Sequence, residues 1–195
     1  MTKGTTIGAF CNSGICLAPT VTMTYFEDLS PYTYTFDSAA LDPVRCVGWL
    51  DAGHVFRTEQ PQPHLLDALW AYCSVLVEPT RGLHSCEFCS RPPNTHVRHG
   101  KRLLLGSGEI RVFSSTGEAF AAPNLVYHYI LEHQYQPPEE FLQAVEKGPR
   151  PESDEYRELL GRLAVGWREN YPVPAEPEWF YFVRTANGVE RKVKK

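Results

Sequence analysis

The feature that most constrains the fold is a pair of cysteines, Cys86 and Cys89, separated by two residues. Two thiolates at this spacing can turn back onto one metal ion and form half of a zinc site. Six cysteines among 195 residues are too few for a disulfide scaffold. A free-thiol pair and a redox pair are the alternatives, and the redox interpretation lacks the strand-to-helix setting of a thioredoxin-like motif. We therefore predict a zinc knuckle at 86–89.

The segment after the knuckle predicts a β-hairpin followed by a helix. Residues 103–105 and 109–113 have the composition of strands, with glycines between them that mark a bend. A turn at 114–117 leads to a returning strand at 118–121, and Pro123 then opens a helix over 123–134. The order of knuckle, hairpin and helix is that of a treble-clef zinc module, in which the helix supplies the remaining ligands.

The predicted helix offers two histidines as ligands, His128 and His133. Positions five apart on a helix point roughly 140° apart, because a turn takes about 3.6 residues. Both can reach one ion only if the helix ends early. We therefore favour His128 as the third ligand.

The fourth ligand is less constrained, and several histidines can supply it. His84 lies two residues before the knuckle, so its side chain must fold back sharply to reach the ion. We take it as the fourth member of the predicted metal site. The alternatives are His54, His96, His99 and His133.

The rest of the chain adds helices and strands that give an α+β fold class. The strand at 44–50 precedes an amphipathic helix at 64–77, whose apolar face includes Cys73 as a core residue. Further helices are predicted at 138–147, and from a Ser153 cap to about Trp167. A strand near 178–184 and an Asn187-Gly188 turn predict a C-terminal hairpin.

The first 22 residues differ from the rest of the chain, since they are rich in Thr, Gly and Ser and show no regular period. We expect residues 1–22 to be a loose or non-native arm, and residues 23–195 to form a single α+β domain starting at Met23. Cys11 and Cys16 in that arm could join a metal site, although ordinary free thiols are the simpler interpretation.

Charge and hydropathy limit the class of function. The net charge of −4 gives no reason to expect binding to nucleic acid. No apolar run approaches the roughly 20 residues that span a bilayer, and no signal-peptide core is visible. We expect a cytoplasmic protein without a membrane partner.

Common catalytic motifs are missing, among them the nucleophile elbow, the phosphate-binding loop and the His-Glu-x-x-His helix. One enzyme class keeps a weak similarity. Asn124, His128 and His133 resemble the last part of an HNH (ββα-metal) nuclease, for which His84 would be the water-activating base. The usual Asp-His pair is missing, and an acidic chain is poorly suited to DNA.

A longer pattern resembles an uncharacterised family of small bacterial proteins with a domain of unknown function. The resemblance covers roughly residues 24–146, agrees with a domain start at Met23, and implies no established activity. It is carried by Tyr25-Phe26-Glu27-Asp28-Leu29-Ser30-Pro31-Tyr32, Val47-Gly48-Trp49-Leu50-Asp51, Cys86-Glu87-Phe88-Cys89, Glu109-Ile110-Arg111-Val112, and Ala122-Pro123-Asn124-Leu125-Val126-Tyr127-His128-Tyr129-Ile130, with His133, Tyr135, Pro137-Pro138 and Phe141 after them.

Together these features predict a cytoplasmic bacterial protein that is stabilised by structural zinc and acts through binding rather than catalysis. A metal-dependent hydrolase or nuclease is the alternative. The expected partner is another protein, because clustered aromatic side chains dominate interface hot spots. The candidates are Tyr25, Phe26, Tyr32 and Tyr34 near the start, and Trp179 to Phe182 near the end.

Overall fold

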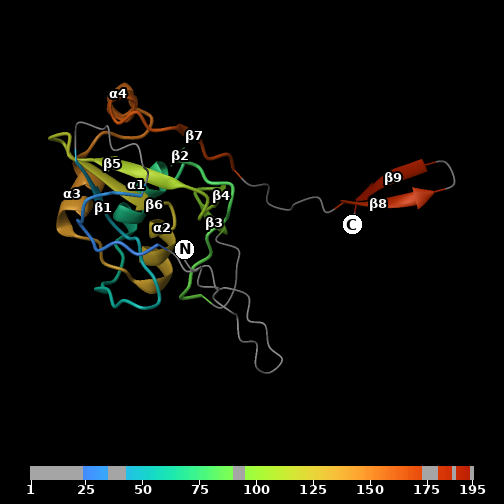
Figure 1. Cartoon of the computed structure of the whole chain (residues 1–195), viewed down its shortest axis with the longest axis horizontal. Coiled ribbons are helices and arrows are strands. Elements are labelled where there is room, and N and C mark those ends of the chain that lie inside the picture. Colours follow the sequence, from blue (N-terminus) through green and yellow to red (C-terminus); the bar gives the residue numbers. More distant parts are fainter. Residues whose placement is uncertain (1–23, 35–42, 90–94, 173–179, 186–187, 194–195) are drawn as a thin grey trace, which may run out of the picture.

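The computed structural model describes residues 24–34, 43–89, 95–172, 180–185 and 188–193 (Figure 1). Helices and strands are mixed in it, which confirms the α+β class. The expectations for residues 1–22, including Cys11 and Cys16, lie outside the described residues. The elements are β1 (Val44–Cys46), α1 (Pro63–Tyr72), β2 (Val75–Val77), β3 (Thr95–Arg98), β4 (Lys101–Leu104), β5 (Glu109–Phe113), β6 (Ala119–Pro123), α2 (Val126–His133), α3 (Glu139–Lys147), α4 (Asp154–Arg162), β7 (Trp167–Glu169), β8 (Phe180–Thr185) and β9 (Gly188–Val193).

A five-stranded sheet with the order β1-β6-β5-β2-β7 forms the centre of the fold. β1 runs parallel to β6, whereas the other neighbouring strands are antiparallel. The β5–β6 pair extends from Glu109 opposite Pro123 to Phe113 opposite Ala119, and all ten of its residues are buried. The buried residues of this pair include the charged Glu109 and Arg111 of β5, which form an ion pair with each other.

The helices pack around this hairpin. α1 contacts α2, α3 and β5, and Phe141 of α3 meets Phe120 of β6 edge to face. On α4, the Tyr156 hydroxyl donates a hydrogen bond to the backbone carbonyl of Arg111 in β5. The hairpin therefore supports the start of α2, the helix that follows it directly (Figure 1).

The entry to α2 is fixed by Asn124, which follows β6. Its backbone N–H donates to the Gly108 carbonyl, and its side-chain Oδ1 accepts from the Gly106 N–H at 2.6 Å. The predicted helix start at Pro123 is thus three residues early, because Pro123 is the last residue of β6. A proline without an N–H suits that strand end, where it needs no ladder donor.

The predicted helix over 64–77 is wrong at its C-terminal end. α1 stops at Tyr72, and Val75–Val77 forms β2, which joins the sheet between β5 and β7. Over three apolar residues, the sequence pattern of a helix cannot be told apart from that of a short buried strand. Pairing with β5 and β7 makes these residues a strand. Cys73 has no exposed surface, so its assignment to the core is confirmed.

The segment that follows the knuckle holds a hairpin, over residues 95–104, that the sequence did not suggest. β3 and β4 pair antiparallel, with Arg98 opposite Lys101, so the turn consists of His99 and Gly100. Both turn residues have positive φ, 48° and 73°, as a two-residue primed turn requires. Residues 103 and 104 consequently belong to this hairpin and not to a strand continuous with β5.

Other local predictions are confirmed. α3 covers 139–147, and the Ser153 hydroxyl caps α4 by accepting the Tyr156 N–H at 3.1 Å. α4 ends at Arg162, however, and Trp167 begins β7. The C-terminal strands β8 and β9 form the predicted hairpin as a two-stranded sheet of their own. Within the described ranges, none of the helices has the length and apolarity needed to cross a membrane.

Candidate metal centre

The knuckle at 86–89 places its two sulfur atoms next to the histidines of helix α2. Glu87 and Phe88 form a tight turn that brings the flanking cysteines together. Cys86 is buried, with 5% of its surface exposed, and Cys89 is half-buried. Burial raises the pKa of the Cys86 thiol to about 11, so a proton stays on this sulfur until a cation replaces it.

The helix α2 supplies two imidazoles from its two ends. His128 lies in the first turn and His133 is the last helical residue. Directly after it, Gln134 takes a left-handed conformation with φ of 56°, and its N–H caps the helix on the Tyr129 carbonyl. Because the helix stops there, the His133 ring turns back toward the knuckle despite the five-residue spacing.

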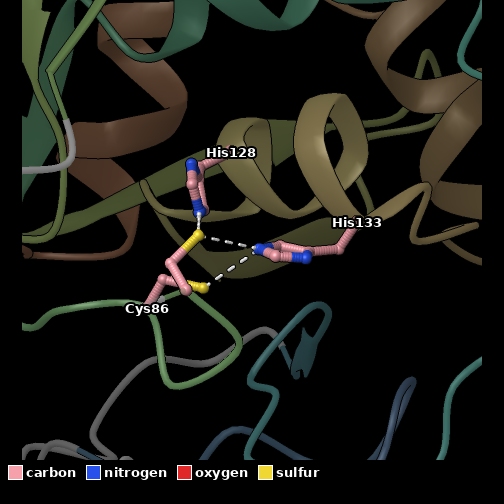
Figure 2. A group of neighbouring side chains, drawn as sticks. Cys86, His128 and His133 are labelled. Atoms are coloured by element: carbon pink, nitrogen blue, oxygen red, sulfur yellow. Dashed lines mark hydrogen bonds between the residues drawn. The ribbon is translucent and has the colours of Figure 1, made fainter. Parts of the chain in front are cut away.

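Both imidazoles meet the knuckle sulfurs (Figure 2). His128 Nε2 lies 3.3 Å from Cys89 Sγ, and His133 Nε2 lies 3.2 Å from Cys86 Sγ and 3.3 Å from Cys89 Sγ. One donor atom of each of the four residues falls within 4.8 Å of the others. A tetrahedral zinc ion would place its sulfur and nitrogen ligands roughly 3.3 to 3.8 Å from one another. The four side chains therefore have the chemistry and nearly the spacing of a Cys2His2 metal site.

The imidazoles are held in the form that binds metal. Burial lowers the pKa of His128 to about 4, and the nearby rings of His96 and His133 contribute to this shift. Burial also lowers the pKa of His133. Neutral imidazole has a free nitrogen lone pair for a metal, whereas the protonated ring has none.

A further histidine lies behind the cluster. His96, on β3, places its Nε2 atom 2.9 Å from Nδ1 of His128. If His128 binds a metal through Nε2, its Nδ1 carries a proton and donates a hydrogen bond to Nε2 of His96. This hydrogen bond fixes both the tautomer and the orientation of the His128 ring. The hairpin β3–β4 thus supports a ligand instead of supplying one.

The knuckle turn is also packed by aromatic rings. Phe88 sits between the two cysteines in sequence, and its ring contacts those of His133, Tyr129 and Phe56 at centroid distances of 5.4, 5.8 and 5.3 Å. These contacts dock the turn against α2 on one side and against the loop at 50–57 on the other.

The predicted ligands fall into two groups. Cys86, Cys89 and His128 come together as expected, and the fourth partner in the described residues is His133. His84, the fourth ligand favoured on sequence grounds, is not a member of this group; its backbone N–H donates to the Gly106 carbonyl.

The remaining candidate histidines have other neighbours. His54 lies 2.7 Å from the Asp51 carboxylate and stacks on Tyr25, and His99 contacts Asp67. What distinguishes His133 is its place as the last residue of α2, where the helix ends.

A comparison with known protein families gives one match. Residues 24–146 fit the family model of a domain of unknown function, DUF7919. The chain belongs to this family. The matched segment covers well over half of the sequence, includes all four residues of the Cys2His2 cluster, and confirms the resemblance seen in the sequence. No curated protein and no solved structure matches the chain.

Proposed function

We propose that this DUF7919 protein is a zinc-stabilised, non-enzymatic module that binds another protein. The observation that supports a metal ion is the convergence of two thiols and two imidazoles within 4.8 Å. A tetrahedral set of two sulfurs and two nitrogens suits zinc above other common cations. Two thiolates also balance the charge of a divalent ion in this buried position.

The proposed role of the ion is structural. Cys89 of the knuckle and His128 of α2 are 39 positions apart, and one ion bound to both would close that long loop. Four protein ligands complete a tetrahedral shell and leave no position for the metal-bound water that hydrolysis requires. This argues against the HNH nuclease, which also needs a base beside the ion; His84, the only candidate that the sequence offered for it, lies outside the cluster.

A binding role fits the remaining features. The thiols must stay reduced to hold a metal, which favours the cytoplasm. Of the aromatic side chains considered for partner binding, Phe26 and Tyr32 are half-buried against Trp49, whereas Tyr34 contacts Trp49 but is exposed. The side chains of Trp179 to Phe182 lie outside the described residues. Tyr25 and Phe26 also border a groove, which is the more specific candidate surface.

The test is metal analysis of protein purified without chelator. About one zinc per chain is expected, together with thiols at 86 and 89 that react with a thiol reagent only after the metal is removed. Well under one equivalent of metal with both thiols freely reactive would refute the proposal.

A further inference from the structure

A groove with a volume of about 570 Å³ runs beside the metal centre. One wall is the N-terminal segment 25–29, the second is the loop 50–57, and the third is the segment 136–140 that opens α3. Its size is in the range of ligand-binding clefts, but its surface carries more charge than pockets for small apolar molecules usually do.

The charge of the groove is strongly one-sided. Five carboxylates face one arginine, Arg57, which gives a formal charge of −4 with His54 neutral. This equals the net charge of the whole chain, so the remainder of the sequence is balanced overall. The carboxylates are Glu27, Asp28, Asp51, Glu139 and Glu140.

Three of these carboxylates are available to a partner. Glu27, Glu139 and Glu140 are exposed and take part in none of the ion pairs that the described residues form. Glu139 accepts a hydrogen bond from the neutral side-chain amide of Gln143, which leaves its charge uncompensated. The other two are engaged within the protein: Asp28 accepts from the Tyr135 hydroxyl and the Gly48 N–H, and Asp51 contacts His54. Fixed carboxylates shape the groove, while exposed ones on two of its walls leave a negative potential unsatisfied.

Aromatic rings lie between the charges. Tyr25, Phe26 and Phe56 line the groove, and Tyr25 is held by stacking on His54 at a centroid distance of 3.7 Å. Lysine and arginine side chains combine an apolar stem with a cationic head, so they can pack on such rings while pairing with the carboxylates.

Two walls of the groove are tied to the metal centre. The loop 50–57 contacts the knuckle through the Phe56–Phe88 ring pair and through the Ala52 N–H, which donates to the Glu87 carboxylate. The same loop pairs with the chain just after His133, where the Gln136 N–H donates to the Arg57 carbonyl. Loss of the ion would therefore loosen the groove.

We propose that this groove binds an extended lysine- or arginine-rich segment of a partner protein, in a manner that depends on metal occupancy. The inference deepens and rests on the proposed function. Charge complementarity selects a basic partner, and the aromatic rings that line the groove add contacts that a simple counterion cannot make.

Fluorescence anisotropy with a labelled decapeptide of alternating lysine and serine tests the proposal, using zinc-loaded protein of measured metal content. We expect binding that a glutamate–serine decapeptide does not show. The triple variant Glu27→Gln, Glu139→Gln, Glu140→Gln should weaken it by about tenfold, since three exposed ion pairs are lost. Chelation of the wild-type protein should abolish it.

The matched control removes three exposed carboxylates elsewhere: Glu152→Gln, Glu155→Gln, Glu158→Gln. It has the same net charge as the groove variant, and Glu155, like Glu139, lies in the first turn of a helix. Equal weakening in both variants would mean nonspecific attraction and overturn the inference. Absence of lysine-peptide binding by fully zinc-loaded protein would overturn it as well, while leaving the metal centre intact as a separate result. A groove-dependent dimer, lost in the groove variant, would identify a second copy as the occupant and also overturn it.

Discussion

The Nε2 atom of His96 lies 2.9 Å from the Nδ1 atom of His128, on the side of the ring that faces away from the cysteine sulfurs. The two residues come from different units, β3 and α2. Partners of this kind orient a metal-bound imidazole and raise its basicity. The hairpin β3–β4 therefore extends the candidate metal centre beyond the four side chains that could hold an ion.

The variant His96→Ala should lower zinc affinity by about 10- to 100-fold without removing the site. Competition with a chromophoric chelator measures this, and the Co²⁺-substituted protein should keep a tetrahedral spectrum. His99→Ala is the matched control, because His99 lies on the same hairpin but contacts the exposed Asp67. Equal affinities of the two variants would show that His96 does not orient the ligand.

Replacement of His133 separates the two candidates for the fourth ligand. His133→Ala should lose most bound zinc, because it removes one of four converging donors, whereas His84→Ala should keep the full equivalent. Metal analysis of both purified variants decides the point. Retention of zinc in His133→Ala with loss in His84→Ala would reverse the assignment.

Cysteine variants test whether the ion is structural. Cys86→Ser and Cys89→Ser should each lower Tm by about 10 °C or more, because metal binding is coupled to folding and its loss removes several kcal/mol. Cys73→Ser should act through packing alone and leave metal content unchanged, since Cys73 is a core residue that lies outside the cluster. Thermal melts with and without chelator measure this; a Cys89→Ser protein as stable as the wild type would contradict a structural role.

Part of the candidate metal centre could be predicted from the sequence because its signals are local. The spacing of Cys86 and Cys89 and the position of His128 in a helix after a hairpin depend on neighbouring residues only. The choice between His84 and His133 was not local. It depended on whether α2 ends at His133. The helix ends there because Gln134 adopts a positive φ, and glutamine, unlike glycine or asparagine, does not predict a helix C-terminus.

The errors in the fold have similar causes. A primed turn usually contains Asn-Gly or Asp-Gly, so His99-Gly100 gave no hairpin signal, and the strand that positions His96 was missed. The three residues of β2 continue the apolar spacing of α1, and only pairing with β5 and β7 makes them a strand. The N-terminal boundaries of α3, which has two acidic residues in its first turn, and of α4, which Ser153 caps, were predicted closely because these signals are local.

A buried ion pair on β5 gives a prediction outside the metal centre. Glu109 and Arg111 are almost fully buried, with Arg111 Nη1 donating to Glu109 at 2.6 Å and the Tyr32 hydroxyl donating to the same carboxylate. Arg111→Met should destabilise the protein by about 3–5 kcal/mol, because it leaves a buried carboxylate without its cation. Adding Glu109→Gln should recover part of this loss. Urea unfolding measures both; a double variant less stable than Arg111→Met would contradict the explanation.

Gly48 follows β1 and lies against Val126, the first residue of α2. Its replacement should therefore destabilise the packing between these two elements. Its φ is +72°, and an added Cβ would lie 2.7 Å from Cγ2 of Val126, the first residue of α2. Gly48→Ala should cost about 1 kcal/mol for the left-handed backbone and about 1–3 kcal/mol more for the overpacking. Gly117→Ala is the control, because Gly117 has φ of +87° but open space around the added Cβ. Urea unfolding should therefore show a larger loss for Gly48→Ala, and zinc affinity should fall only in that variant, since Val126 lies two residues before His128. Equal losses would mean that backbone strain alone acts at position 48.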